Sequence, residues 1–233
     1  MKEKNELIGM GETDTVELLG QMAGDEPFEL FKRIRPFTTL LMQYRCAIRE
    51  IETKLHVLNE EFSLEHERNP IELIESRVKE PASILEKMKR KGYELSVKQI
   101  EEKLNDVAGV RVICSFVEDI YYLASMLSAQ DDLEVVKVKD YIKHPKKNGY
   151  RSLHLIIQIP IFLSSEKKYM RVEVQFRTIA MDFWASLDHK LKYKKNVKNP
   201  ELIVEELRKC ADIISGVDVR MQEIRNMIEA GNM

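Results

Sequence analysis

The sequence predicts an α+β fold, a mixed sheet of about five strands flanked by helices, with helical extensions at the N- and C-terminal ends. About five short runs rich in β-branched residues alternate with amphipathic stretches at helical spacing. With 44% hydrophobic and 33% charged residues, the 233-residue chain can bury an ordinary core. No repeat or Pro- or Ser-rich linker divides its middle, so one central domain is expected.

The N-terminal elements are predicted as follows. Residues 1–27 are acidic and dotted with glycine, and we expect loose structure there. Over 36–62, apolar residues recur at helical spacing and predict one long amphipathic helix. The segment IELIESRVK (71–79) is a strand candidate. Pro81 then opens the helix PASILEKMKRKG, which Gly92 closes.

The remaining elements alternate between the two periodicities. A helix over 97–104 leads into VAGVRVICSF, a β-branched strand. The elements predicted next are a helix over 118–130, strands over 133–141 and 150–163, the alternating strand KKYMRVEVQFRT and the helix IAMDFWASLDHKLKYK. Over 200–230 the pattern predicts two helices, broken near Gly216.

The charge balance limits the partners that the chain can recruit. Its formal net charge is -2 at pH 7, so no overall positive field draws it to DNA or RNA. The longest apolar run, over 153–163, is interrupted by Gln158 and Pro160 and is too short to cross a bilayer as a helix. No apolar stretch of signal-peptide length opens the sequence. We expect a cytoplasmic protein with no membrane or DNA partner.

The cysteines and the absent motifs exclude several enzyme classes. The 3 cysteines are odd in number and widely spaced, which is typical of thiols in a reducing compartment. No metal-ligand spacing links them to histidine. The sequence has no GxxxxGK[ST] phosphate loop and no HExxH, GxSxG or CxxC motif, so familiar nucleotide-binding and hydrolase signatures are missing.

The strand RVEVQFRT combines a core face with an unusually polar face. Because side chains alternate along a strand, Arg171, Glu173, Gln175 and Arg177 share one face, opposite Val172, Val174 and Phe176. A polar face of this composition could line a site. The alternative is the solvated face of an edge strand.

A second polar group could grip a polyphosphate. Arg77 and Lys79 share a strand face, while Ser83 and Lys87 share a helix face one turn apart. They lie near a helix N-terminus, which itself attracts anions. Solvated lysines on an outer helix are the alternative.

Asp106, in DVAGVR, is a plausible magnesium ligand. It stands at the entry of an otherwise apolar strand, and Mg²⁺ is usually held by one or two carboxylates together with phosphate oxygens. An N-cap or turn role is the alternative. Strict alternation would put Asp106 and Arg111 on opposite faces unless Gly109 marks a bulge.

The segment HPKKNGYRSLH (144–154) predicts a cationic loop that leads into a buried strand. Its Asn-Gly pair is a turn signal, and the loop delivers Tyr150 at the start of the next strand. Tyr150, Ser152 and His154 would share one face. A tyrosine ring can stack on a base, and loop lysines suit phosphates. A hairpin with a half-buried tyrosine is the alternative.

Four segments, in this order, together resemble the synthetase domain of the RelA/SpoT proteins. They are SRVKEPASILEKMKRK, DVAGVRVICSF, VKDYIKHPKKNGYRSLH and VEVQFRTIAMDFWASLDHKLKYK. The resemblance covers roughly residues 35–200, and the short length is similar to that of a stand-alone small alarmone synthetase, a GTP pyrophosphokinase. It implies a nucleotidyltransferase-like mixed sheet flanked by helices, which agrees with the elements above.

The resemblance implies a reaction and a domain organisation. Members of the family transfer pyrophosphate from ATP to the 3′-hydroxyl of GDP or GTP, making ppGpp or pppGpp, the alarmones of the stringent response, and releasing AMP. Mg²⁺ is the implied cofactor. On this basis we expect a flexible segment over 1–30, the synthetase domain over 31–199, and a helical extension over 200–233 that serves oligomerisation.

By similarity, the motif residues acquire roles at a donor site and a metal site. Arg77 and Arg111 would sandwich the ATP adenine between guanidinium planes. The resemblance gives the ATP phosphates to Lys79, Ser83 and Lys87. Asp106 would be the principal magnesium ligand, assisted by Glu173, and Glu173 would also orient or deprotonate the attacking 3′-hydroxyl.

The acceptor site implied by the resemblance centres on Tyr150. Its ring would stack on guanine, with Asn148 and Gln175 nearby for polar contacts. The remaining phosphates would be bound by Lys139, Lys143, Lys147, His154 and Arg177. Such a site needs alignment and charge neutralisation more than covalent chemistry.

Two further expectations concern activity and partners. The long family members carry a hydrolase domain marked by a His-Asp pair, and none of the 5 histidines here is followed by aspartate, so no hydrolase activity is expected. Small alarmone synthetases assemble as homotetramers through terminal helices, and some bind their alarmone product or single-stranded RNA. A terminal helix that packs only on its own core is the alternative.

Two other functions compete with alarmone synthesis. The first keeps the transfer but directs it to the 3′ end of tRNA or to adenine nucleotides, although tRNA would favour a broader basic surface. The second is a non-catalytic nucleotide-binding regulator. Asp106 and Glu173 argue against it, because binding alone needs no magnesium-ready carboxylate beside a base.

Overall fold

The computed structural model describes residues 27–192 and 199–231, in two units over residues 1–42 and 43–233. The first unit contains, among described residues, only the beginning of helix α2. In order, the elements are α2 (Pro27–His66), β1 (Ile71–Val78), α3 (Pro81–Lys91), α4 (Val97–Lys103), β2 (Ala108–Cys114), α5 (Val117–Ser128), β3 (Glu134–Asp140), β4 (Leu153–Phe162), β5 (Lys167–Thr178), α6 (Ile179–Lys192) and α7 (Pro200–Gly231). No helix within the described ranges has the length and apolarity needed to cross a membrane.

The five strands form one mixed sheet in the order β1-β2-β5-β4-β3. β2 and β5 are parallel, and the other neighbouring pairs are antiparallel. This arrangement confirms the predicted fold class. It also places β5 in the centre of the sheet, so the interpretation of RVEVQFRT as a solvated edge strand is wrong.

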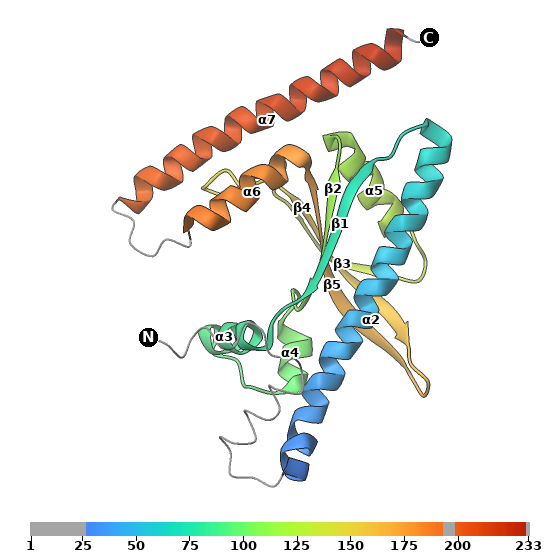
Figure 1. The fold of residues 1–233 in the computed structure, drawn as a ribbon, viewed down its shortest axis with the longest axis vertical. Helices are drawn as coiled ribbons and strands as arrows, with labels where there is room; N and C mark the ends of the chain where they lie inside the picture. The colour runs from blue at the N-terminus through green and yellow to red at the C-terminus, as the bar shows by residue number, and fades with distance from the viewer. Residues whose placement is uncertain (1–26, 193–198, 232–233) are drawn as a thin grey trace. The chain divides into compact units, whose positions relative to one another are not determined.

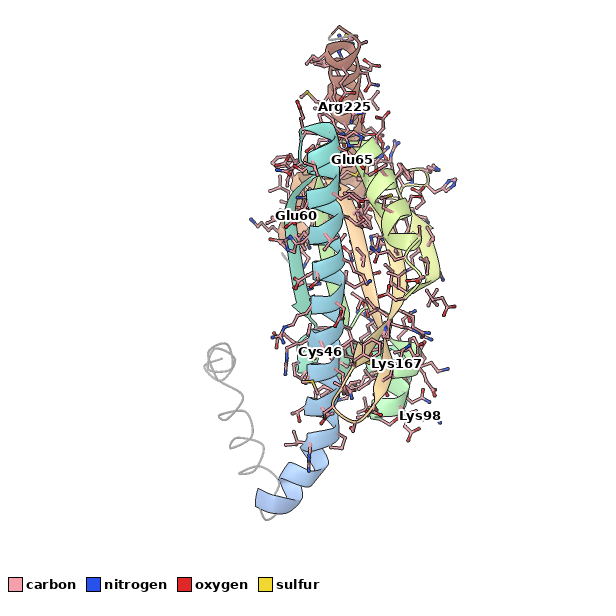
Figure 2. The ribbon with its side chains drawn as sticks, turned by 90° about the vertical axis from the view of Figure 1, so that its right-hand side faces the viewer. Cys46, Glu60, Glu65, Lys98, Lys167 and Arg225 are labelled. Carbon is pink, nitrogen blue, oxygen red and sulfur yellow. The ribbon has the colours of Figure 1, made fainter. Side chains whose placement is uncertain are left out.

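One face of the sheet is the hydrophobic core. Alternate residues of the central strands are buried on it, including Val110, Val174 and Phe176. From Gln43 onward, α2 runs along this face and α5 lies beside it, as Figures 1 and 2 show from two sides. Their apolar residues, such as Ile51 and Leu123, are also buried. The apolar side chains that recur every 2 residues in the strands therefore pack in one layer against those that recur about every 3.6 residues in the helices.

Helices α6 and α7 are joined by buried polar contacts. The Thr178 hydroxyl accepts a hydrogen bond from Met181 N (3.0 Å) at the start of α6 and donates one to Asp218 Oδ2 (2.8 Å) on α7. Trp184 Nε1 on α6 donates to Leu207 O (3.0 Å). Burial raises the pKa of Asp218, although the bond from Thr178 opposes that effect. These contacts hold α7 against the domain.

Two predicted helix boundaries are wrong. The helix expected over 36–62 begins earlier, at Pro27, and continues through Pro36. Pro36 removes one backbone donor, which this long helix tolerates. The expectation for residues 1–27 lies outside the described residues, except for Pro27 itself. The two helices expected over 200–230 are one continuous helix, α7, because a single exposed glycine costs a helix only about 1 kcal/mol.

Substitution by alanine should change the free energy of unfolding in opposite directions at Gly92 and Gly216. Gly92 caps α3 with φ 69°, a conformation that costs an L-residue about 1–2 kcal/mol. Gly92→Ala should therefore lower the free energy of unfolding by that amount. Gly216 lies inside α7 with open space around its Cβ position, so Gly216→Ala should raise it by up to about 1 kcal/mol. Urea unfolding of both variants checks the pair, and equal shifts of the same sign would contradict the assignment.

Candidate active site

The second face of the sheet is polar, and the strand register fixes which residues share it. Residues paired directly across strands point to the same side. Arg77 pairs with Gly109, Gly109 with Glu173, and Glu173 with Ile156. Two residues along each strand, on the same side of the sheet, the pairing gives a second row. It consists of Glu75, Arg111, Gln175, His154 and Lys139. Segments that are far apart in the sequence thus form one continuous polar surface.

Lys79, Lys87 and Asp106 form a charged cluster at one end of this face. Lys79 Nζ and Lys87 Nζ both donate to Asp106 Oδ2, at 2.7 and 2.5 Å. Lys79 follows β1 directly, and its backbone N–H bonds Val107 O at 2.7 Å. The cluster therefore joins the end of β1, the second half of α3 and the turn before β2.

Asp106 offers an oxygen that no residue in the described part of the chain bonds. Burial opposes ionisation of this carboxyl, but the hydrogen bonds and charges of Lys79 and Lys87 outweigh burial and lower its pKa. Its other oxygen, Oδ1, is buried and has no hydrogen-bond partner. An ionised carboxylate with one buried, unpartnered oxygen fits a hard divalent cation. No group of three or more His, Cys, Asp or Glu side chains in the described chain could hold a metal alone.

The suggested bulge at Gly109 is absent. The pairing of β2 with β1 and β5 is regular through Gly109 and Arg111. Asp106 lies before the strand, in the turn that precedes Ala108, so strand alternation does not apply to it. Its position relative to Arg111 is therefore set by the turn and not by a bulge.

Arg77 and Arg111 line a cavity of about 440 Å³ on the polar face of the sheet. Arg77 lies opposite Gly109, and Arg111 lies opposite Glu75. Arg111 Nη1 donates to Glu75 Oε2 at 2.9 Å, while the Arg111 Nε is buried without a partner. The missing side chain of Gly109, which also lines the cavity, leaves space between Arg77 and Glu173.

Five side chains next to this cavity form a closed hydrogen-bonded ring, called here the five-residue ring. His154 Nδ1 lies 3.2 Å from Glu173 Oε1, and His154 Nε2 lies 2.8 Å from Tyr150 Oη. Arg177 Nη2 donates to Tyr150 Oη (2.9 Å) and Gln175 Oε1 (3.0 Å). Gln175 Nε2 donates to Glu173 Oε2 (2.8 Å) and closes the ring.

Burial opposes the ionisation of both Glu173 and His154, with different outcomes. Desolvation opposes ionisation of Glu173, but hydrogen bonds from His154 and Gln175 and the charge of Lys139 outweigh it and lower the pKa of Glu173. Desolvation also lowers the pKa of His154, against the hydrogen bond to Glu173. At neutral pH the ring therefore contains a carboxylate and a neutral imidazole, whose Nδ1–H donates to Glu173.

Tyr150, which belongs to the five-residue ring through its hydroxyl, also offers the face of its aromatic side chain. It precedes β4, which begins at Leu153 and not at the predicted residue 150, but its hydroxyl still reaches His154. Lys146 Nζ lies 4.4 Å from the centroid of the Tyr150 ring and 4.6 Å from that of Tyr141. One face of the Tyr150 ring therefore already binds a cation, and such a face can also serve as a stacking platform.

Of the other predicted residues, Lys139 lies next to the five-residue ring, and the rest make other contacts or are exposed. Lys139 Nζ is 3.8 Å from Glu173 Oε1, whereas Lys143 pairs with Asp140 and lies over the Tyr121 ring. Lys147 and Ser83 are exposed.

Asn148 Nδ2 donates to Asp188 Oδ2 on α6 (3.3 Å), and its Oδ1 accepts from Tyr150 N (3.4 Å). Asn148 thus shapes the loop in this structure.

The sequence reasoning missed several residues of this face. Glu75 stands two residues before Arg77, and that spacing could have placed it on the same strand face. Asp182 on α6 accepts from Arg177 Nη1 (2.8 Å) and lies 3.5 Å from Arg111 Nη1. No local pattern marks Asp182, because the helix meets the sheet only in the folded chain.

Together these groups can bind two anionic ligands on either side of one carboxylate. Glu173 lies between Gly109, on the side of the arginine-lined cavity, and Ile156, on the side of His154 and Tyr150. One side offers two lysines, two arginines and a free carboxylate oxygen. The other offers an aromatic face with further cations. This geometry suits a transfer between two phosphorylated molecules.

Comparisons with known proteins agree in sequence and structure. A model of the region found in RelA/SpoT proteins matches residues 76–198. The chain is 47% identical to GTP pyrophosphokinase YwaC of Bacillus subtilis strain 168 over 189 residues, 81% of this chain and 90% of that protein. It is 40% identical to GTP pyrophosphokinase YjbM of the same strain over 81% of this chain and 88% of that protein.

Solved structures give the same result. Small alarmone synthetase 2 of Bacillus subtilis matches with a TM-score of 0.74 and 44% identity, over 82% of this chain and 98% of that chain. Small alarmone synthetase 1 of the same organism, bound to its product pppGpp, matches with a TM-score of 0.75 and 37% identity, over 84% and 99%.

Proposed function

The chain belongs to the RelA/SpoT family, and we propose that it transfers pyrophosphate from ATP to the 3′-hydroxyl of GDP or GTP, making ppGpp or pppGpp and AMP. Its relatives are GTP pyrophosphokinases. The observation that carries the proposal is the position of one ionised carboxylate, Glu173, between an arginine-lined cavity and an aromatic face. A site with this arrangement can align two nucleotides and accept a proton between them.

The donor half would hold ATP by charge and by planar stacking. Arg77 and Arg111 line the cavity and would lie against the adenine. Lys79 and Lys87, with Ser83 in the first turn of α3, would bind the phosphates. Both lysines pair with Asp106 in this structure, so the ATP phosphates would compete with that carboxylate for them.

Magnesium fits the two carboxylates of the site. Asp106 would be the main ligand through its unpartnered oxygen, assisted by Glu173. When bound, Mg²⁺ would neutralise charge on the ATP phosphates and help to orient them.

The acceptor half would hold GDP or GTP against Tyr150. Guanine would stack on the tyrosine ring and displace the Lys146 ammonium that lies over it. Gln175 and Asn148 would make polar contacts to the acceptor. The cations proposed for its phosphates are Lys139, Lys143, Lys147, Arg177 and, when protonated, His154.

Glu173 would act as the general base. The 3′-oxygen of the acceptor attacks the β-phosphorus of ATP while its proton passes to Glu173, and the bond from that phosphorus to the oxygen of the α-phosphate breaks, releasing AMP. His154 and Gln175 hold both carboxylate oxygens in place. The lysine pair offsets the negative charge of the phosphates.

A product assay with several acceptors tests the proposal. Purified protein is incubated with Mg²⁺, ATP and, separately, GDP, GTP, GMP, AMP or tRNA, and products are resolved by anion-exchange chromatography. Release of AMP matched by a guanine nucleotide with two added phosphates is the expected result. Product only with tRNA or adenine nucleotides would move the acceptor assignment, and no transfer at all would favour a binding regulator without hydrolase or transferase activity.

Tyr150→Ala is expected to raise the KM for GDP by about 5- to 150-fold, since stacking on one base contributes about 1–3 kcal/mol. The KM for ATP should stay near the wild-type value. Steady-state kinetics with each nucleotide varied in turn checks this. Tyr169→Ala is the matched control, because Tyr169 is an exposed tyrosine near the start of β5. An unchanged GDP dependence in Tyr150→Ala would remove Tyr150 from the site.

We further propose that the chain acts as a homotetramer, with 31–199 as the synthetase domain and 200–233 as its assembly element. Ile213, Val217, Ile224 and Ile228 are exposed on α7 at spacings of one helical face, which supports burial against another copy. Sedimentation should give four times the chain mass. An alarmone product or single-stranded RNA could regulate such an assembly. The free thiols of Cys114 and Cys210 agree with a cytoplasmic location.

A further inference from the structure

The loop over 141–152, between β3 and β4, is called here the acceptor loop. Helix α7 approaches it at a glycine that has no room for a side chain. Gly149 is buried, with φ +87°. A Cβ atom added there would lie 2.4 Å from Ala211 Cβ and 3.1 Å from Arg208 Cα on α7. The backbone of the loop therefore rests directly on the surface of the helix, one residue before Tyr150.

A charged contact lies next to this approach. Arg151 Nη1 donates to Gly149 O (3.2 Å), and its Nη2 donates to Asp212 Oδ1 on α7 (3.2 Å). The guanidinium thus ties the loop to the residue that follows Ala211. Tyr150 stands between the glycine and this arginine, so both neighbours of Tyr150 are held by α7.

The side chain of Tyr150 joins the same contact. Trp184, Leu207 and Ala211 form a buried apolar cluster, and Tyr150 and Ile214 pack against it. The ring centroids of Tyr150 and Trp184 are 6.5 Å apart. The space left between α7, α6 and the loop is only about 10 Å³. Any enlargement of Ala211 must therefore move either α7 or the acceptor loop.

We propose that α7 is a positioning element of the acceptor subsite, with Ala211 and Asp212 as the residues that set the pose of Tyr150. This inference rests on the proposed function, in which Tyr150 is the platform for guanine. The donor cavity and the cluster of Lys79, Lys87 and Asp106 have no residue on α7. A shift of α7 should thus weaken acceptor binding and leave ATP binding alone.

The test compares two substitutions in the contact with two matched controls on the same helix. Ala211→Leu enlarges the contact, and Ala230→Leu makes the same change at an exposed position near the end of α7. Asp212→Asn removes the charge that holds Arg151, and Glu206→Gln removes an exposed carboxylate that pairs with Lys209. Neither Ala211 nor Asp212 belongs to the proposed catalytic machinery.

Trp184 supplies a readout that does not depend on turnover. It is the chain's single tryptophan and packs against Ala211, so its fluorescence should follow GDP binding next to Tyr150. In Ala211→Leu we expect the GDP dissociation constant and the KM for GDP to rise about tenfold. The KM for ATP should stay within about twofold. Asp212→Asn should show the same split with a smaller change, and both controls should match the wild type.

Two results from the variants would overturn the proposal. If both variants fold, by circular dichroism, and keep wild-type GDP binding, α7 does not position the subsite. If the KM values for GDP and ATP rise equally, the contact supports only the general fold. If either result is found while the wild type transfers pyrophosphate to GDP in the product assay, this inference alone fails. A wild type that neither binds nor uses guanine nucleotides would sink the proposed function as well.

Discussion

Glu173→Gln is expected to abolish pyrophosphate transfer, by a factor on the order of 10²–10⁴ in rate, while ATP binding stays near the wild-type value. Glutamine has the shape of glutamate but cannot accept the proton of the 3′-hydroxyl. It would also turn an amide toward Gln175 or His154, both of which donate hydrogen bonds to Glu173 in the wild type. The cations of the donor half remain in place, so ATP still has its partners.

Single-turnover release of AMP measures the loss, and equilibrium dialysis with ATP measures binding. Glu134→Gln is the matched control, because Glu134 is an exposed glutamate on the edge strand β3. Near-normal turnover in Glu173→Gln would defeat the role of general base. Equal loss of turnover and ATP binding would instead make Glu173 a part of the donor site.

Asp106→Asn is expected to reduce transfer by a factor on the order of 10²–10³, the effect of losing one electrostatic contact to a transition state. The asparagine keeps the size of the side chain but removes the charge and the carboxylate oxygen available to Mg²⁺. The same change frees Lys79 and Lys87 from their shared partner. In EDTA the variant should therefore bind ATP more tightly than the wild type, since the phosphates no longer compete with Asp106.

Opposite changes in rate and in metal-free binding distinguish this explanation from simple unfolding, which would lower both. Transfer is measured across a range of Mg²⁺ concentrations, and ATP binding is measured by dialysis in EDTA. Asp132→Asn is the control, because Asp132 also pairs with a lysine, Lys54, in a different part of the chain. A variant with wild-type rate and Mg²⁺ dependence would exclude Asp106 as a metal ligand.

Much of the fold could be predicted from periodicity. The strand pattern of β5 and the helix signals at Pro81 and Gly92 are confirmed, because each depends on neighbours within a few residues. The helix ends that were predicted at Pro36 and near Gly216 were wrong. There the local cost of a proline or glycine was outweighed by the rest of a long helix.

The candidate site was predictable in residue type and less so in arrangement. The alternation of RVEVQFRT put Glu173, Gln175 and Arg177 on one face, and the structure joins all three in the five-residue ring. Whether that face was exposed at an edge or central depended on strand order. No local pattern gives strand order, because pairing of β5 with β2 and β4 joins segments separated by helices and loops.

By itself, the sequence determined most of the secondary-structure elements, the polar face of β5 and the four motifs of the family, since these are encoded in local spacing and residue type. The tertiary structure alone decided that Asp106 meets Lys79 and Lys87, that His154 bonds Glu173, and that α7 rests on Gly149. Each of these contacts joins distant parts of the chain. Their geometry depends on how buried apolar faces pack, and that packing is a property of the whole fold.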